Sequence, residues 1–305
     1  MSYKLVLALV GGVGLALSAG EASALVVTNT SDSGALTGAL VANPSNFNSI
    51  SATYTVGDPA QVGTYTGFTS PPVTIGNGIV LSTGNAVDTV GPYRNDVGDG
   101  DVSTGFGAGS TPEINAYAPG HIDGWSSSHD AAVVQVNFNL AAPSAIKFSF
   151  IFGSVEFPEF TSEFTDSFLV FLDDAQITFD ASGNPVQVGN SFAASLRTDD
   201  TNTIFTGVGA DPGNSAHGLL DVLTTISATL AAGDHVLKFE VSDTNDGALD
   251  SAAFITGFDT TVNAGGPVTE PGEPGEPGTP GAPEPGTLAL LGLGLAGLGA
   301  LRRRR

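Results

Sequence analysis

Alternating apolar and polar residues run through the middle of the chain, and this alternation predicts β-strands. Val134–Leu140 alternates without a break, and Ile146–Phe152 places four apolar side chains on one face. Pro143 separates the two segments. We therefore expect them to form neighbouring strands that each bury one face.

Other segments extend the strand pattern. Phe168–Leu172 is apolar throughout, which is typical of a central strand buried on both faces, and Val236–Val241 alternates again. Further strands are predicted at Ile79–Leu81, Val222–Leu230 and Ala252–Phe258. Many short strands separated by Gly, Asp and Pro turns predict an all-β fold, a single β-sandwich or jelly-roll domain.

One short helix is expected near the start of this domain. Ala35–Val41 places Leu36 and Leu40 on one face, with Ser33 as the expected N-cap. Asn43-Pro44 is expected to end the helix, because a residue before proline avoids helical backbone angles.

The first 24 residues have the layout of a secretory signal peptide. Lys4 precedes an apolar run that begins at Leu5, and Ala22-Ser23-Ala24 forms a small-x-small cleavage site. A membrane-spanning anchor or a buried helix is the alternative. Glycines interrupt the apolar run, which is also short for a span. We therefore assign residues 1–24 to a signal peptide and residues 25–262 to the folded domain.

The other end of the chain combines a linker, a short apolar segment and a basic tail. Residues 263–282 are rich in Pro and Gly, Thr287–Leu301 is apolar, and the chain closes with Arg302, Arg303, Arg304 and Arg305. Arginines after an apolar helix hold that end in the cytoplasm, so the preceding domain lies outside. The apolar segment is shorter than the ~20 residues of a full span, which favours a sorting or transient anchor.

Pro283-Glu284-Pro285, the apolar segment and the arginine tail together resemble a PEP-CTERM sorting signal over residues 283–305. The resemblance implies processing by an exosortase, a membrane enzyme. It also implies a Gram-negative bacterium that makes exopolysaccharide. A plain tail anchor is the alternative reading of the same segment.

The body of the chain resembles the choice-of-anchor L domain, an extracellular domain that is joined to differing surface anchors. Three regions carry the resemblance: Gly34–Leu40 with Gly76–Gly84; Phe148–Phe160 with Asp166–Phe168; and Gly218–Leu223 with His235–Asp243 and Asp250–Ala252. The family usually has Ser-Glu-Glu-Tyr-Pro-Glu in the central region. Here Val155 and Phe157 replace the first Glu and the Tyr.

The composition of the chain is strongly acidic. The chain has no Cys, and its 31 acidic residues face only nine Lys and Arg. Five of those nine lie in the two ends, which leaves Arg94, Lys147, Arg197 and Lys238 in the domain. Such a surface repels nucleic acid and anionic lipid and attracts cations. Acidity that merely keeps an exported protein soluble is the simpler explanation of the same numbers.

Acidic residues recur where the predicted strands end, and six of them, in two clusters, are candidate ligands of Ca²⁺ sites: Glu156, Glu159, Asp166, Asp243, Asp246 and Asp250. Loop carboxylates supply the hard oxygen ligands that Ca²⁺ requires. The alternative is that these residues are ordinary turn formers.

An enzyme is the competing functional hypothesis. Glu156 and Glu159 could serve as the paired carboxylates of a secreted carbohydrate-active enzyme. Two acids only three residues apart are better placed as ligands or turn residues, and no H-E-x-x-H or G-x-S-x-G motif occurs. We therefore predict no catalytic residues, and an exported surface or matrix module whose partners are exopolysaccharide or other surface proteins.

Overall fold

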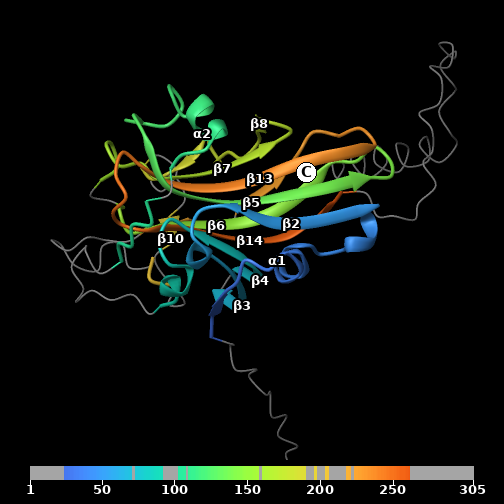
Figure 1. The fold of residues 1–305 in the computed structure, drawn as a ribbon, viewed down its shortest axis with the longest axis horizontal. Helices are drawn as coiled ribbons and strands as arrows, with labels where there is room; N and C mark the ends of the chain where they lie inside the picture. The colour runs from blue at the N-terminus through green and yellow to red at the C-terminus, as the bar shows by residue number, and fades with distance from the viewer. Residues whose placement is uncertain are drawn as a thin grey trace, which may run out of the picture. The chain divides into compact units, whose positions relative to one another are not determined.

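The computed structural model describes residues 24–70, 73–91, 102–107, 109–157, 160–189, 196–197, 203–205, 218–220 and 223–261. The chain divides into two compact units, residues 1–263 and 264–305. All the described residues belong to the first unit, and they form two antiparallel sheets packed face to face (Figure 1). The predicted all-β sandwich is confirmed.

The first sheet has six strands in the order β2-β5-β13-β7-β8, with β9 also paired to β7. Their bounds are β2 Ser49–Val56, β5 Ser128–Leu140, β13 Gly233–Thr244, β7 Ser167–Leu172, β8 Ala175–Gln176 and β9 Val186–Gln187.

The second sheet has eight strands in the order β1-β3-β4-β14-β6-β11-β10, with β12 also paired to β6. Their bounds are β1 Val26–Asn29, β3 Val62–Ser70, β4 Val73–Ser82, β14 Ser251–Thr260, β6 Ile146–Ser154, β11 Gly218–Leu220, β10 Leu196–Arg197 and β12 Leu223–Ile226.

The expectation that Val134–Leu140 and Ile146–Phe152 pair with each other is wrong. The first segment lies in β5 of the six-stranded sheet and the second in β6 of the eight-stranded sheet. Their apolar faces instead meet across the space between the sheets, where both join one large core. Alternation identifies the buried face of a strand but carries no information about its hydrogen-bonded neighbour.

Phenylalanine rings fill the centre of this core. Phe239 on β13 meets Phe148 on β6 edge to face, with ring centroids 5.0 Å apart, and stacks on Phe168 of β7 at 6.4 Å. Phe150 adds a further ring 4.8 Å from Phe168. The rings therefore join the two sheets through side chains that alternate along each strand.

β7 is buried along its whole length, as its continuous apolar sequence predicts. Its outer face packs under the helix α2, Pro112–Tyr117, where Ile114, Leu169 and Phe171 belong to a separate apolar cluster. This helix was not anticipated, because six residues are too few to show a helical period. Thr111 caps it, accepting a hydrogen bond from the Ile114 amide at 3.1 Å.

The predicted N-terminal helix is present as α1, Ser33–Leu40, with Leu36 and Leu40 buried. Its cap is Asp32 rather than Ser33, because the Asp32 carboxylate accepts from the Ala35 amide at 2.8 Å. Ser33 lies inside the helix and donates to the Ala52 carbonyl. Three short 3₁₀ turns complete the described helices: η1 Pro44–Asn46, η2 Pro59–Gln61 and η3 Ala86–Thr89.

Candidate functional site at the acidic end of the sandwich

The sandwich brings the predicted acids to one end. Because the strands are antiparallel, β6 and β13 finish where β5, β7 and β14 begin, on the left in Figure 1. We call the described acids gathered there the acidic end: Glu156, Asp166, Asp243, Asp246 and Asp250. Glu159, the sixth predicted residue, lies outside the described residues.

Asp166 is fully buried just before β7 and accepts hydrogen bonds from both sheets. Its two carboxylate oxygens accept from the Thr244 amide of β13 at 2.9 Å and from the Ser251 hydroxyl of β14 at 2.7 Å. Burial raises the pKa of Asp166 above its usual value, and these two hydrogen bonds oppose the rise. Its role in this arrangement is to join the sheets.

Asp250 precedes β14 and is held by the segment 102–107, which lies before α2 in the chain. Its carboxylate accepts from the Thr104 amide at 2.8 Å. Burial raises its pKa to about 6, with Asp88 and Asp130 adding to the rise. Gly84 makes room for this carboxylate, because a Cβ at that position would lie 1.8 Å from an Asp250 oxygen.

Asp243 and Glu156 have unsatisfied oxygens. Each residue is only 1% exposed, and the Asp243 Oδ1 and Glu156 Oε2 atoms have no hydrogen-bond partner. Burial raises the pKa of both carboxyls, and Asp166 adds to the rise in each case. Both carboxyls also hydrogen-bond to Asp166. A buried carboxylate oxygen without a partner is costly, so the acidic end is built to share protons or to receive a cation.

A pocket of about 370 Å³ opens beside these two acids. Glu156, Asp246 and Ser103 contribute its polar groups, and its apolar lining consists of Phe160, Phe164, Ala248 and Leu249. Asp246 is half-buried, and its carboxylate accepts from the Ala248 amide at 3.3 Å. We call this cavity the Phe160 pocket.

The sequence did not single out the groups that brace this end. Gln61 is fully buried, and its side-chain amide donates to the Thr83 and Asp130 carbonyls, both at 2.8 Å. It thereby ties the end of β4 to the start of β5. The Asn245 side chain accepts from Ser126 and donates to Gly124. Isolated Gln and Asn residues give no pattern from which these roles could be predicted.

The acids converge without completing a metal cage. Among the described residues, no three acidic or histidine side chains lie close enough together to hold a metal ion. A cation bound here would therefore take ligands from at most two of these carboxylates, with hydroxyl or carbonyl oxygens supplying the rest.

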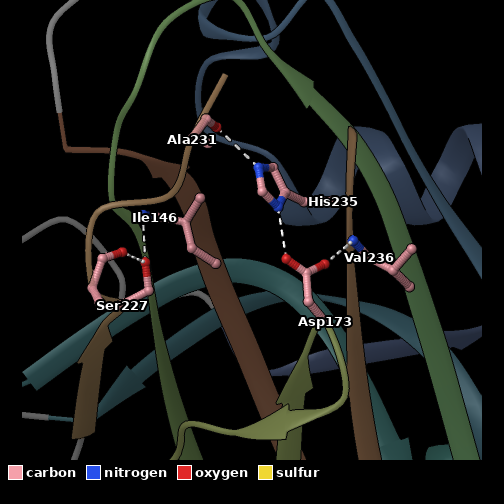
Figure 2. A network of polar contacts seen from close by, with 7 residues as sticks. Ile146, Asp173, Ser227, Ala231, His235 and Val236 are labelled. Atoms are coloured by element: carbon pink, nitrogen blue, oxygen red, sulfur yellow. Dashed lines mark hydrogen bonds and ion pairs between the residues drawn. The ribbon is translucent and has the colours of Figure 1, made fainter. Parts of the chain in front are cut away.

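The opposite end of the six-stranded sheet has a different polar network, shown in Figure 2. His235 lies between the Asp173 carboxylate, 2.7 Å from Nδ1, and the Ala231 carbonyl, 3.0 Å from Nε2. Asp173 also accepts from the Val236 amide at 3.0 Å. Burial lowers the pKa of His235, but hydrogen bonding to Asp173 and Ala231 outweighs it and raises the pKa above its usual value.

Comparison with known families now identifies the domain. The family model of the choice-of-anchor L domain matches residues 22–259, about three quarters of the chain. The chain belongs to the choice-of-anchor L domain family. A second model, the PEP-CTERM protein-sorting motif, matches residues 282–305. The two together describe an exported, exosortase-sorted protein of the cell envelope, and they point to a surface protein rather than an enzyme.

Other comparisons add little to the choice-of-anchor L assignment. No curated protein matches the sequence significantly. A crystal structure of a β-glucosidase from Kluyveromyces marxianus is similar over 67% of this chain and 19% of that chain, with 10% identity and a TM-score of 0.21. A likeness at that TM-score supports no conclusion about fold or activity. Within the described residues, the helices are all too short or too polar to cross a membrane.

Proposed function

We propose that this choice-of-anchor L domain is a non-catalytic binding module of the extracellular matrix, with exopolysaccharide as its partner. The main support for this proposal is the outer face of the six-stranded sheet, where neutral amide and hydroxyl side chains lie opposite one another on neighbouring strands. Ser51 on β2 lies opposite Asn137 on β5, and Thr53 lies opposite Gln135 in the next row. Amide and hydroxyl groups both donate and accept hydrogen bonds, which suits the hydroxyls of a glycan.

The same face has a defined hollow. A pocket of about 330 Å³ is lined by Ser49, Ser51, Asn137, Asp234 and His235, together with apolar neighbours. Asn139 donates to Asp234 at 2.6 Å, and Gln135 donates to Asn137 at 3.0 Å. These hydrogen bonds orient the amides while leaving part of their bonding capacity for a ligand. We call this surface the amide face.

Sedimentation with exopolysaccharide tests this proposal. We expect the full-length chain, purified in a mild detergent, to pellet with exopolysaccharide from the producing bacterium. Asn137→Ala should lower the bound fraction several-fold, because it removes both a donor and an acceptor from the hollow. Thr28→Ala, an exposed change on β1 of the other sheet, serves as the matched control. Equal binding by both variants and the parent chain would exclude the amide face, and no binding at all would overturn the proposed partner.

The second element of the proposal is stabilisation by Ca²⁺ at the acidic end. It is supported by the unpartnered Asp243 oxygen and by the mutual repulsion of Asp243 and Asp250, which a cation would relieve. Hard oxygen ligands of this kind suit Ca²⁺. Asp166 is the least available of the predicted ligands, since both of its oxygens already accept hydrogen bonds.

Thermal unfolding of the full-length chain in detergent, after EDTA and then with Ca²⁺ or Mg²⁺, tests the cation. A ligand at a hundredfold excess over its dissociation constant adds about 2.7 kcal/mol, so the unfolding midpoint should rise with Ca²⁺. The Ca²⁺-dependent rise should disappear in Asp243→Asn and Asp250→Asn but persist in Asp174→Asn, an exposed turn acid at the far end of β7. Identical midpoints in EDTA, Mg²⁺ and Ca²⁺ would refute this element.

A further inference from the structure

We propose that the Phe160 pocket binds the protonated amine of an amino sugar within the matrix polysaccharide. This inference deepens the proposed function and rests on it, because it names the class of sugar that the module recognises. The pocket lies at the acidic end, whereas the amide face lies on the outside of β2 and β5. The two surfaces can therefore be tested separately.

The pocket combines a buried acceptor with an accessible one. Glu156 is 1% exposed, lines the pocket and leaves Oε2 without a hydrogen-bond partner. Asp246 lines the same cavity and is half-buried. At about 370 Å³, the cavity is in the usual range for small-ligand sites. A positively charged donor that enters it would meet one carboxyl group inside and a second from the turn after β13.

Neither of the two lysines among the described residues pairs with the Glu156 carboxyl group. Lys238 is ion-paired with Glu113 of α2, on the outer side of the six-stranded sheet. Lys147 is the second residue of β6, whereas Glu156 lies two residues beyond the end of that strand. The two residues are nine positions apart in the chain, roughly 25–30 Å along an extended strand. Neither of these two lysines therefore reaches the pocket.

The walls of the pocket favour an organic cation over a metal ion. Phe160 and Phe164 meet edge to face with centroids 5.9 Å apart, and Leu249 adds an aliphatic surface. Aromatic rings stabilise ammonium groups through cation–π attraction and also cover the hydrocarbon around them. A small metal ion instead requires six to eight oxygens, and the pocket's lining provides mostly carbon.

An amino sugar would match the carboxyl groups, the aromatic walls and the serine of the pocket at once. Its ammonium group pairs with Glu156 and Asp246, its ring carbons pack against the phenyl rings, and its hydroxyls reach Ser103. The acidic charge of the whole domain would draw such a cationic chain toward the surface. A neutral or N-acetylated sugar has no positive charge to pair with the carboxyl groups of the pocket. The acetyl group of an N-acetylated sugar would also put a bulky amide where the ammonium group fits.

Calorimetric titration of the full-length chain in detergent, with matched oligosaccharides, tests the inference. The probes are a glucosamine tetramer, the same tetramer fully N-acetylated, a lysine tetrapeptide with blocked ends, and CaCl₂ alone. We expect the glucosamine tetramer to bind, and the N-acetylated tetramer to bind at least about tenfold more weakly, because losing one charged partner at a desolvated site costs tenfold or more.

Three variants locate the binding. Asp246→Asn and Phe164→Ala should each weaken glucosamine binding at least about tenfold, and Glu156→Gln should do the same if it folds. Glu163→Gln, an exposed acid one residue before Phe164, is the matched control and should bind as the parent does. Asp246 is half-buried, so its variant keeps the test decisive even where Glu156→Gln fails to fold.

Each contrary outcome has a defined meaning. Equal binding of both tetramers, or glucosamine binding that is unchanged in Asp246→Asn, would overturn the amine site. Binding of the lysine peptide or of Ca²⁺ without the glucosamine tetramer would overturn the amino sugar as occupant. If the amine site fails while the chain still sediments with exopolysaccharide through Asn137, the proposed function stands without this inference.

Discussion

Replacing Phe239 with alanine is expected to lower the free energy of unfolding by about 3–5 kcal/mol. Phe239 is fully buried on β13 between the two sheets, where its ring contacts Phe148 of one sheet and Phe168 of the other. Removing the ring takes away its transfer free energy and leaves a cavity that the strands cannot close without losing their pairing. This loss is a large part of the 5–15 kcal/mol that stabilises a typical domain.

Urea unfolding monitored by circular dichroism measures the Phe239 effect. Phe239→Leu provides a graded comparison and should cost clearly less, because it retains most of the apolar volume. Ile226→Ala is the surface control, since Ile226 is 62% exposed on the short edge strand β12, and it should change stability by no more than about 0.5 kcal/mol. Similar losses in Phe239→Ala and Ile226→Ala would show that the aromatic core does not carry the stability.

Replacing Glu240 with glutamine is expected to stabilise the domain at pH 8 and to leave it nearly unchanged at pH 4. Glu240 is buried beneath α2, where the Thr111 hydroxyl donates to its Oε2 at 2.6 Å and its Oε1 has no partner. Burial raises the pKa of Glu240 from 4.5 to about 7, against the opposing effect of the Thr111 hydrogen bond. The native state therefore retains a proton that the unfolded chain releases near pH 4.5.

The direction of the pH dependence follows from this difference in proton binding. Between pH 4.5 and about 7 the native state holds more protons than the unfolded state, so the free energy of unfolding falls as the pH rises. A difference of about 2.5 between the two pKa values corresponds to about 3 kcal/mol, all of it lost above pH 7. A glutamine at position 240 carries no such proton and removes this part of the pH dependence.

Denaturant unfolding across pH 4 to 8 in EDTA tests the Glu240 prediction. The stability curves of Glu240→Gln and the parent chain should converge at low pH and separate as the pH rises. Glu163→Gln, an exposed change, should follow the parent at every pH. Parallel curves for Glu240→Gln and the parent would mean that Glu240 titrates as an ordinary surface acid.

Much of the domain was predictable from local pattern. Leu237, Phe239 and Val241 face the core as the alternation in β13 requires, and the continuous apolar run of β7 is buried on both faces. These predictions succeed because the side chains of a strand point alternately to its two faces, whatever strand lies beside it. The predicted Leu36 and Leu40 face of α1 is buried for the corresponding helical reason.

The sequence predicted which acidic residues make up the candidate site, but not their burial or their hydrogen bonds. The acids at strand ends were visible in the sequence, and the antiparallel strands brought five of them to one end. That Asp166 is saturated by Thr244 and Ser251, while Glu156 retains a free oxygen beside Phe160, depends on contacts across the two sheets. Gln61 and Glu240 gave no signal, because a lone polar residue looks the same whether it is buried or solvated.

Local patterns in the chain were enough to predict the sandwich class and the inward faces of its strands, because side-chain alternation depends on neighbouring residues. Short motifs were enough to predict the family and the sorting signal. Three features became visible only in the folded domain: β5 and β6 lie in opposite sheets, α2 covers β7, and Glu156 and Asp246 share a pocket. Strand pairing and burial arise from contacts between residues far apart in sequence, and many pairings are compatible with the same alternation.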